Sequence, residues 1–232
     1  MVEQWMSCPI EPVREGYPYQ IPVECGQPLV DITDMERVHF EATYAQMGLK
    51  NTLTRCYVRQ EVAQMLQRVL ESLPEEYSLC IYDTLRPKDV QQSLYDMYWQ
   101  QLAQENPGAS EEEITALIDD FVAYPRIDYE RPTPHSTGGA VDLTLMKNGQ
   151  PLPMGTEFDD LTEKAHTRYF ENAVTEEEKE FRDNRRLLYH GMIQAGFANY
   201  WNEWWHYAYG DRAWGHETGK TPIYSYIALE KD

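Results

Sequence analysis

Two short polar segments set among apolar residues constrain this chain more than any other feature. The first is His-Ser-Thr-Gly-Gly-Ala-Val-Asp over residues 135–142, and the second is Glu-Trp-Trp-His over residues 203–206. Together they supply two histidines and two carboxylates. A zinc hydrolase needs three protein ligands, an open position for water and a general base beside it. The two segments therefore predict a fold that brings these distant parts of the chain to one point.

The first segment runs into a predicted strand. Residues 140–145 alternate between aliphatic residues and smaller or polar ones, which is typical of a strand with two different faces. Asp142 lies on the face opposite the aliphatic residues, and His135 precedes the strand. The two glycines between them allow a sharp turn, so both side chains can reach one site. The alternative is that His135 is a loop histidine that only makes hydrogen bonds.

The second segment belongs to an aromatic stretch, residues 197–209, which predicts another strand. Glu203 and His206 are three residues apart, so a regular strand would place them on opposite faces. If both serve one metal site, this stretch must contain a bulge or a bend. The alternative is an aromatic core strand with a polar end.

Periodic patterns predict helices and strands in the rest of the chain. Apolar residues recur at helical spacing in the predicted helices, which cover residues 59–73, 87–104, 110–121 and 176–195. The third of these begins with a capping box, Ser110 and Glu113, and has an apolar stripe of Ile114, Leu117, Ile118 and Phe121. Strands are expected over residues 29–32 and 77–84, and a hairpin turn over residues 147–150. Irregular structure is expected over residues 1–35 and 210–232.

Arg86 lies where a buried strand meets the next helix, a junction at which side chains commonly face a site. The alternative is a surface arginine paired with Asp83 or Asp89.

Charge and length exclude several classes of function. The 232 residues contain 39 acidic and 20 basic side chains, a formal net charge of −19, so no basic surplus exists to neutralise nucleic acid or anionic lipid. The first residues lack a signal-peptide pattern, and no stretch approaches the roughly 20 apolar residues of a membrane span. We therefore expect a cytoplasmic protein, in which the cysteines, Cys8, Cys25, Cys56 and Cys80, are free thiols.

At these residues the chain resembles the D-alanyl-D-alanine dipeptidases of the VanX type. That family belongs to the zinc D,D-peptidases, which share a fold with lysostaphin-like enzymes and the hedgehog signalling domain. The similar segments are HSTGGAVDLTL, EWWHY, YDTLRP with the family's arginine, MGTEFDDLTEKAH and NRRLLYHGMIQAGF. The resemblance extends from about residue 60 to residue 209.

The resemblance implies an α+β fold, with helices packed on a small central antiparallel sheet. The length of the chain suits one domain, which we expect to span residues 1–232. The resemblance also implies one Zn²⁺ per chain and a small D,D-dipeptide as substrate, and it leaves the oligomeric state open. The implied zinc ligands are His135, Asp142 and His206. Glu203 is the implied general base and acid, Arg86 the residue that stabilises the transition state, and Asp159 the acceptor of the substrate ammonium.

Two departures from the family pattern bear on specificity for dipeptides. Thr133 stands where the family usually has serine, and residues 43–46 match only weakly the N-terminal segment that helps to shape the substrate pocket. One alternative is therefore a zinc D,D-carboxypeptidase or cell-wall endopeptidase acting on longer muropeptides. Another is a non-catalytic, zinc-stabilised binding domain, against which the combination of Arg86 and Glu203 argues.

Overall fold

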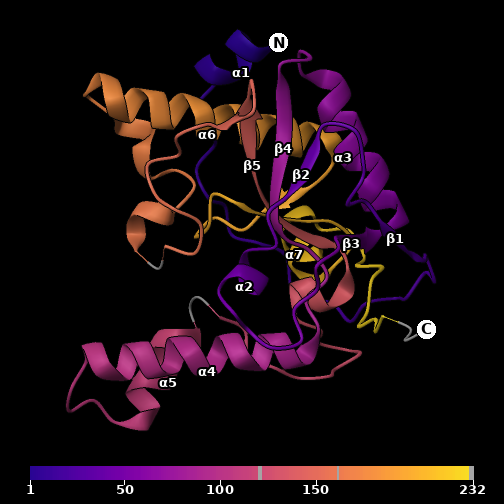
Figure 1. Ribbon diagram of the computed structural model, residues 1–232, viewed down its shortest axis with the longest axis vertical. Helices are drawn as coiled ribbons and strands as arrows, with labels where there is room; N and C mark the ends of the chain where they lie inside the picture. The colour runs from indigo at the N-terminus through magenta and orange to yellow at the C-terminus, as the bar shows by residue number, and fades with distance from the viewer. Residues whose placement is uncertain (120–121, 161, 230–232) are drawn as a thin grey trace.

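A mixed β-sheet runs through the centre of the computed structural model, which describes residues 1–119, 122–160 and 162–229 (Figure 1). In spatial order its strands are β2 (Val38–Phe40), β4 (Tyr77–Asp83), β5 (Ala140–Lys147), β8 (His206–Ala208) and β7 (Ala198–Asn199), and β6 (Gln150–Pro151) pairs with β5. These pairs are antiparallel except β2–β4, which is parallel. A separate antiparallel pair consists of β1 (Leu29–Asp31) and β3 (Tyr57–Arg59).

Helices flank this sheet and form a further layer at one end of the molecule. The α-helices of the described ranges are α1 (Val2–Ser7), α2 (Thr43–Gln46), α3 (Gln60–Ser72), α4 (Lys88–Glu105), α5 (Glu111–Asp119), α6 (Glu176–Ala195) and α7 (Arg212–Thr218). Short 3-10 helices are η1 (Pro134–Thr137), η2 (Glu163–Ala165) and η3 (Tyr169–Asn172). Helices α4 and α5 pack together at the end opposite α1 and α6 (Figure 1). The predicted α+β class is confirmed.

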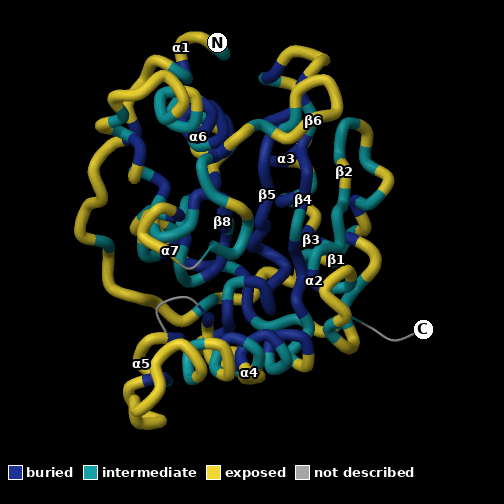
Figure 2. Tube along the Cα trace, turned by 60° about the vertical axis from the view of Figure 1, so that its left-hand side comes forward, coloured by how far each residue is buried: buried dark blue, intermediate teal, exposed yellow. Residues whose placement is uncertain are grey.

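The main core lies between α3, α6 and the sheet. Helix α3 buries Val62, Leu66 and Val69 at helical spacing, and they belong to one cluster with Ile81 of β4 and Leu143 of β5. Burying such a side chain stabilises the fold by about 1.5–3 kcal/mol before conformational entropy is subtracted. The central strands are buried almost throughout, whereas much of α5 faces solvent (Figure 2). Strands β5 and β8, which carry Asp142 and His206, are thus among the most buried elements of the molecule.

Local signals at the ends of the elements act as the sequence predicts. Ser110 and Glu113 form the capping box, since each backbone N–H bonds to the other residue's side chain. Helix α6 begins after Thr175, whose side chain accepts from the Glu178 N–H, and ends at Gly196 with a φ of 107°. The turn between β5 and β6 has positive φ at both central residues, as a two-residue hairpin requires.

The structure differs from the sequence expectations at both ends of the chain, in the stretch 197–209 and in helix α5. The first residues form α1, whose Trp5 is buried against α6, and the C-terminal segment contains α7 with Trp214 buried. The stretch 197–209 is two short strands, β7 and β8, joined by a turn. In the predicted stripe of α5, Leu117 is 42% exposed, and Phe121 lies outside the described residues. Of the described residues of that stripe, Ile114 and Ile118 are buried.

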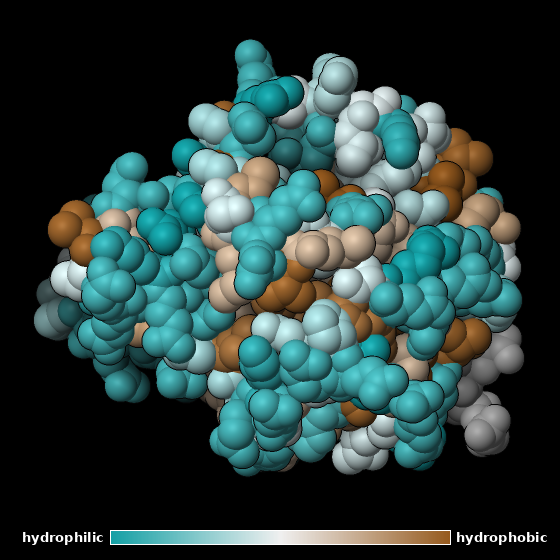
Figure 3. Space-filling model, turned by 90° about the horizontal axis from the view of Figure 1, so that it is seen from above, coloured by the Kyte–Doolittle hydropathy of each residue, from teal (hydrophilic) through white to brown (hydrophobic). Residues whose placement is uncertain are grey.

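Hydrophilic and hydrophobic residues are unevenly distributed on the surface. Figure 3 shows one face covered mostly by hydrophilic residues, with hydrophobic ones in small groups between them. Cys56 and Cys80 are buried, Cys8 and Cys25 are exposed, and all four are free thiols. Among the described helices, none is both long enough and apolar enough to cross a membrane.

Candidate metal centre and substrate cleft

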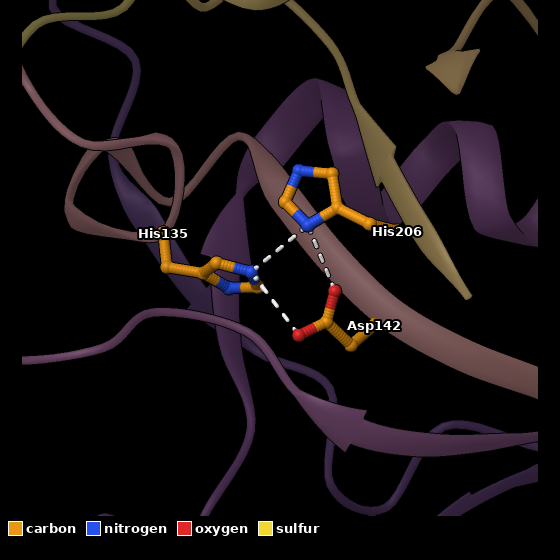
Figure 4. Close-up of side chains that lie close together, drawn as sticks. All are labelled: His135, Asp142 and His206. Carbon is orange, nitrogen blue, oxygen red and sulfur yellow. Dashed lines mark hydrogen bonds and ion pairs between the residues drawn. The ribbon is translucent and has the colours of Figure 1, made fainter. Parts of the chain in front are cut away.

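Strand pairing places two of the three predicted ligands beside each other. Asp142 of β5 is directly opposite His206 of β8 in the antiparallel register, so both side chains emerge on the same face. His135 lies in η1, and the chain reverses at Gly138, which has a φ of 70°. At Gly139 a Cβ atom would lie 2.4 Å from the Tyr209 carbonyl oxygen, so only glycine fits this close approach. All three side chains are buried and converge (Figure 4).

The donor atoms of these three residues form a triangle whose sides are slightly shorter than tetrahedral zinc requires. His135 Nε2 lies 3.2 Å from His206 Nδ1 and 3.2 Å from Asp142 Oδ2, and His206 Nδ1 lies 2.9 Å from Asp142 Oδ1. Zinc–ligand bonds of about 2.0–2.2 Å in tetrahedral geometry separate ligand atoms by roughly 3.3–3.6 Å. His135 Nδ1 lies 2.7 Å from the Thr84 carbonyl oxygen. That contact fixes the proton on Nδ1 and leaves Nε2 free for a metal.

Electrostatics also suit a cation at this point. Burial by itself raises the pKa of Asp142, but the His135 and His206 imidazoles outweigh it and hold that pKa below the usual range of aspartate. The carboxylate is therefore the charged form, which is the form that binds a metal. Two imidazole nitrogens and one carboxylate oxygen are a typical donor set for a catalytic zinc site.

Glu203 reaches the same point because of the turn between β7 and β8. Asn199 Nδ2 donates to the carbonyl oxygens of Glu203, at 3.0 Å, and of His206, at 2.9 Å, and this contact closes the turn. One carboxylate oxygen of Glu203 then lies 3.7 Å from His206 Nδ1. Burial and the neighbouring Asp142 raise the pKa of Glu203. The three-residue spacing of Glu203 and His206 required a bend in the predicted strand. The chain has a turn there, which divides the stretch into β7 and β8.

Arg86 is buried beside the cluster and is not on the surface. Its Nε donates to Asp83 at 2.7 Å, its Nη1 to Gln91 at 3.0 Å, and its Nη2 to Tyr44 Oη at 3.1 Å. Its Nη2 also lies 3.5 Å from Asp142 Oδ2. The pairing with Asp83 therefore exists, but it fixes a guanidinium that lines the cleft.

Asp159 faces the same cleft from the loop between β6 and α6. Its backbone has a φ of 59°, a left-handed conformation uncommon outside glycine, and its carboxylate accepts from Tyr44 Oη at 3.0 Å. Burial raises the pKa of Asp159 to about 6. The hydroxyl of Tyr44 thus links Asp159 to Arg86, a role that sequence reasoning missed. The only signal for it was the weak match of residues 43–46 to the family's pocket-forming segment.

These side chains line a cleft of about 370 Å³, a volume within the range of small-molecule sites. Its walls come from α4, the turn between β7 and β8, the N-terminal segment and α7. Sequence reasoning named Asp83 only as a possible surface partner of Arg86, and it missed Gln91, which contacts Arg86, and Tyr98, which contacts Asp159.

A buried pair of histidines and an aspartate, with a glutamate beside them, is the donor set of a zinc metallopeptidase, and the chain is one. It belongs to the D-Ala-D-Ala dipeptidase family, whose model matches residues 37–224. Two proteins named D-alanyl-D-alanine dipeptidase are each 30% identical to it. The Synechocystis sp. protein aligns over 84% of this chain and 87% of its own length, and the Enterococcus faecium protein over 70% and 78%.

A solved structure of lower similarity is a mutant of the vancomycin-resistance D,D-pentapeptidase VanY in complex with Zn(II). It is 17% identical, with a TM-score of 0.43, over 69% of this chain and 75% of that one.

Proposed function

We propose that this protein hydrolyses the free dipeptide D-Ala-D-Ala to two molecules of D-alanine. The observation that carries the proposal is the position of Asp159, a carboxylate in the same cleft as the His-Asp-His cluster. A free dipeptide brings an ammonium group close to its scissile bond, and a half-buried carboxylate is its natural partner. The names of the two relatives support the same substrate.

In this mechanism His135, Asp142 and His206 hold the zinc ion. Zinc, when bound, supplies Lewis-acid activation of water and polarisation of the peptide carbonyl. The fit of the three donor atoms to a tetrahedral site supports this assignment. The Thr84 carbonyl oxygen keeps the His135 ring in the orientation that the site needs.

Glu203 moves the protons. Its carboxylate takes a proton from the attacking water and later delivers it to the nitrogen of the leaving D-alanine. The environment suits this exchange, because burial and nearby carboxylates raise the pKa of Glu203 and so make its carboxylate a stronger base than an ordinary glutamate. The tightly packed Trp204 and Trp205, both 2% exposed, anchor the turn that positions Glu203.

Arg86 stabilises the negative charge that develops on the carbonyl oxygen. Asp83, Gln91 and Tyr44 fix the guanidinium before the substrate arrives, so little reorganisation is needed in the transition state. Losing one donor of this kind typically lowers kcat by about 10²–10³. The Tyr44 hydroxyl also donates to Asp159. One hydroxyl therefore links Arg86, which faces the carbonyl oxygen of the substrate, to Asp159, which faces its ammonium group.

The direct test is to incubate the zinc-loaded protein with D-Ala-D-Ala, with D-Ala-D-lactate and with a longer peptide that ends in D-Ala-D-Ala. We expect release of D-alanine from the dipeptide and little from the longer peptide or from N-acetyl-D-Ala-D-Ala, since acetylation removes the ammonium. Comparable release from the longer peptide would indicate a carboxypeptidase. No release from any of them, with zinc stoichiometrically bound, would favour a binding domain.

A further inference from the structure

The N-terminal segment closes one side of the cleft by packing on α7. The Tyr17 N–H donates to the His216 carbonyl oxygen at 2.7 Å, and the Tyr19 ring stacks on the His216 imidazole, with centroids 4.3 Å apart and planes at 7°. Gly16 lies so close to the same imidazole that a Cβ atom would be 2.1 Å from its Nε2. We call residues 16–20 together with α7 the outer wall.

Arg212, the first residue of α7, is the cation of this wall. Its guanidinium lies over the Tyr19 ring, 5.0 Å from the centroid, and its Nε donates to the Gln20 carbonyl oxygen at 3.2 Å. These two contacts set the plane of the guanidinium. Within the described part of the chain, Nη1 and Nη2 of Arg212 have neither a hydrogen-bond partner nor an ion pair, and the residue lines the cleft.

The charges around the cleft make these two free nitrogens distinctive. The cleft is lined by acidic side chains, among them Asp142, Asp159 and Glu203, and by two arginines. Every terminal nitrogen of Arg86 already has a protein partner. Among the described residues that line the cleft, Arg212 is therefore the arginine whose Nη1 and Nη2 are both available to a ligand. A planar guanidinium can bind a carboxylate through two parallel hydrogen bonds.

A free dipeptide carries a carboxylate as well as an ammonium group. If Asp159 receives the ammonium, the carboxylate enters an acidic cleft and needs a cation to offset its loss of hydration. We propose that Arg212 receives the terminal carboxylate of the substrate, and that Tyr19 and Gln20 hold its guanidinium in place. This inference rests on the proposed function and names the group that recognises the second residue.

The test compares D-Ala-D-Ala with its C-terminal amide, in the wild-type protein and in Arg212→Gln, Arg212→Lys and Arg14→Gln. Arg14 is the matched control, because it lies on the N-terminal segment and is 82% exposed. For Arg212→Gln we expect KM for the dipeptide to rise about 10- to 100-fold, the typical effect of losing a charge-assisted pair, with kcat nearly unchanged. KM for the amide should not change, Arg212→Lys should be intermediate, and Arg14→Gln should match the wild type.

Equal turnover of dipeptide and amide by the wild type would overturn the role of Arg212, and so would the same loss on both substrates in Arg212→Gln. The proposed function would still stand in either case. Absence of hydrolysis by the wild type would contradict the proposed function instead. Equilibrium binding of the dipeptide and of its amide to the zinc-loaded wild type and to Arg212→Gln would then decide the inference. A loss of affinity in Arg212→Gln for the dipeptide alone would support the role of Arg212, whereas equal affinities of the two proteins for the dipeptide would overturn it.

Discussion

At the scale of single residues, the assignment of Glu203 as general base depends on one carboxylate 3.7 Å from the nearest ligand nitrogen. Glu203→Gln keeps the size and polarity of the side chain but removes its capacity to accept a proton. We expect kcat for D-Ala-D-Ala to fall about 10²- to 10⁴-fold, while the zinc content measured by atomic absorption stays at one per chain. Glu180→Gln, on the exposed face of α6, is the control and should be unaffected. Full activity of Glu203→Gln with zinc bound would exclude the role.

Asp159 gives the enzyme a specific pH dependence. Burial raises its pKa to about 6, so in the free enzyme the carboxylate is charged above that pH and neutral below it. Only the charged form pairs with the substrate ammonium. We therefore expect kcat/KM to fall as pH decreases through about 6, approaching tenfold per unit. Asp159→Asn should lower kcat/KM at neutral pH and abolish the further decrease of kcat/KM at acidic pH, whereas Asp160→Asn should retain that decrease. If kcat/KM of Asp159→Asn still decreases in the same way as pH falls, a titratable group other than Asp159 causes the decrease.

At the scale of elements, the loop that carries Asp159 is held by Arg185 of α6. Its guanidinium donates to the carbonyl oxygens of Met154 at 2.7 Å, His166 at 2.7 Å and Lys164 at 2.9 Å, and the residue is 1% exposed. Arg185→Leu removes a donor from each of these acceptors, and the His166 carbonyl oxygen keeps only its bond from the Tyr169 N–H. We expect the free energy of unfolding, measured by urea denaturation, to fall by about 2–5 kcal/mol.

Arg182→Leu on the same helix is the matched control, because within the described residues the ion pair of Arg182 is with the neighbouring Asp183. Its cost should stay below about 1 kcal/mol. Equal costs for the two variants would show that Arg185 does not fix the loop. A raised KM for D-Ala-D-Ala in Arg185→Leu, at temperatures where the variant is folded, would show that the loop positions Asp159.

The elements that sequence reasoning predicted are those whose signals are local. Helices α3 and α6 follow from apolar residues that recur at helical spacing, and the start of α5 follows from its capping box. Helices α1 and α7 were missed because each is a single short amphipathic stretch held by one buried tryptophan and by contacts distant in sequence. Tyr44 was missed for the same reason, since its partners Arg86 and Asp159 are distant along the chain. The need for a bend before His206 was predictable from spacing, but its form as a closed turn was not.

At the scale of the whole molecule, the three candidate ligands join parts of the chain that depend on the entire sheet. His135 lies in η1, Asp142 in β5 and His206 in β8, and β5 pairs with both β4 and β8. The ligand triangle forms only when the sheet is folded, so a metal that binds it binds the native state alone. By linkage, such a ligand stabilises the protein by about 4 kcal/mol when its free concentration is a thousand times Kd.

Removing zinc should therefore lower the melting temperature, by about 10 °C for a chain of this size at that saturation. We expect calorimetry of the chelated protein to show this decrease and added Zn²⁺ to reverse it. The shift should become smaller as pH falls, because protons compete with the metal for the imidazoles and the carboxylate. His206→Ala should abolish the shift, whereas His190→Ala on α6, whose ring bonds to the Cys8 carbonyl oxygen and packs against the Tyr189 ring, should keep it. A shift that survives in both His135→Ala and His206→Ala would mean that zinc binds elsewhere and that the triangle in the sheet is not its site.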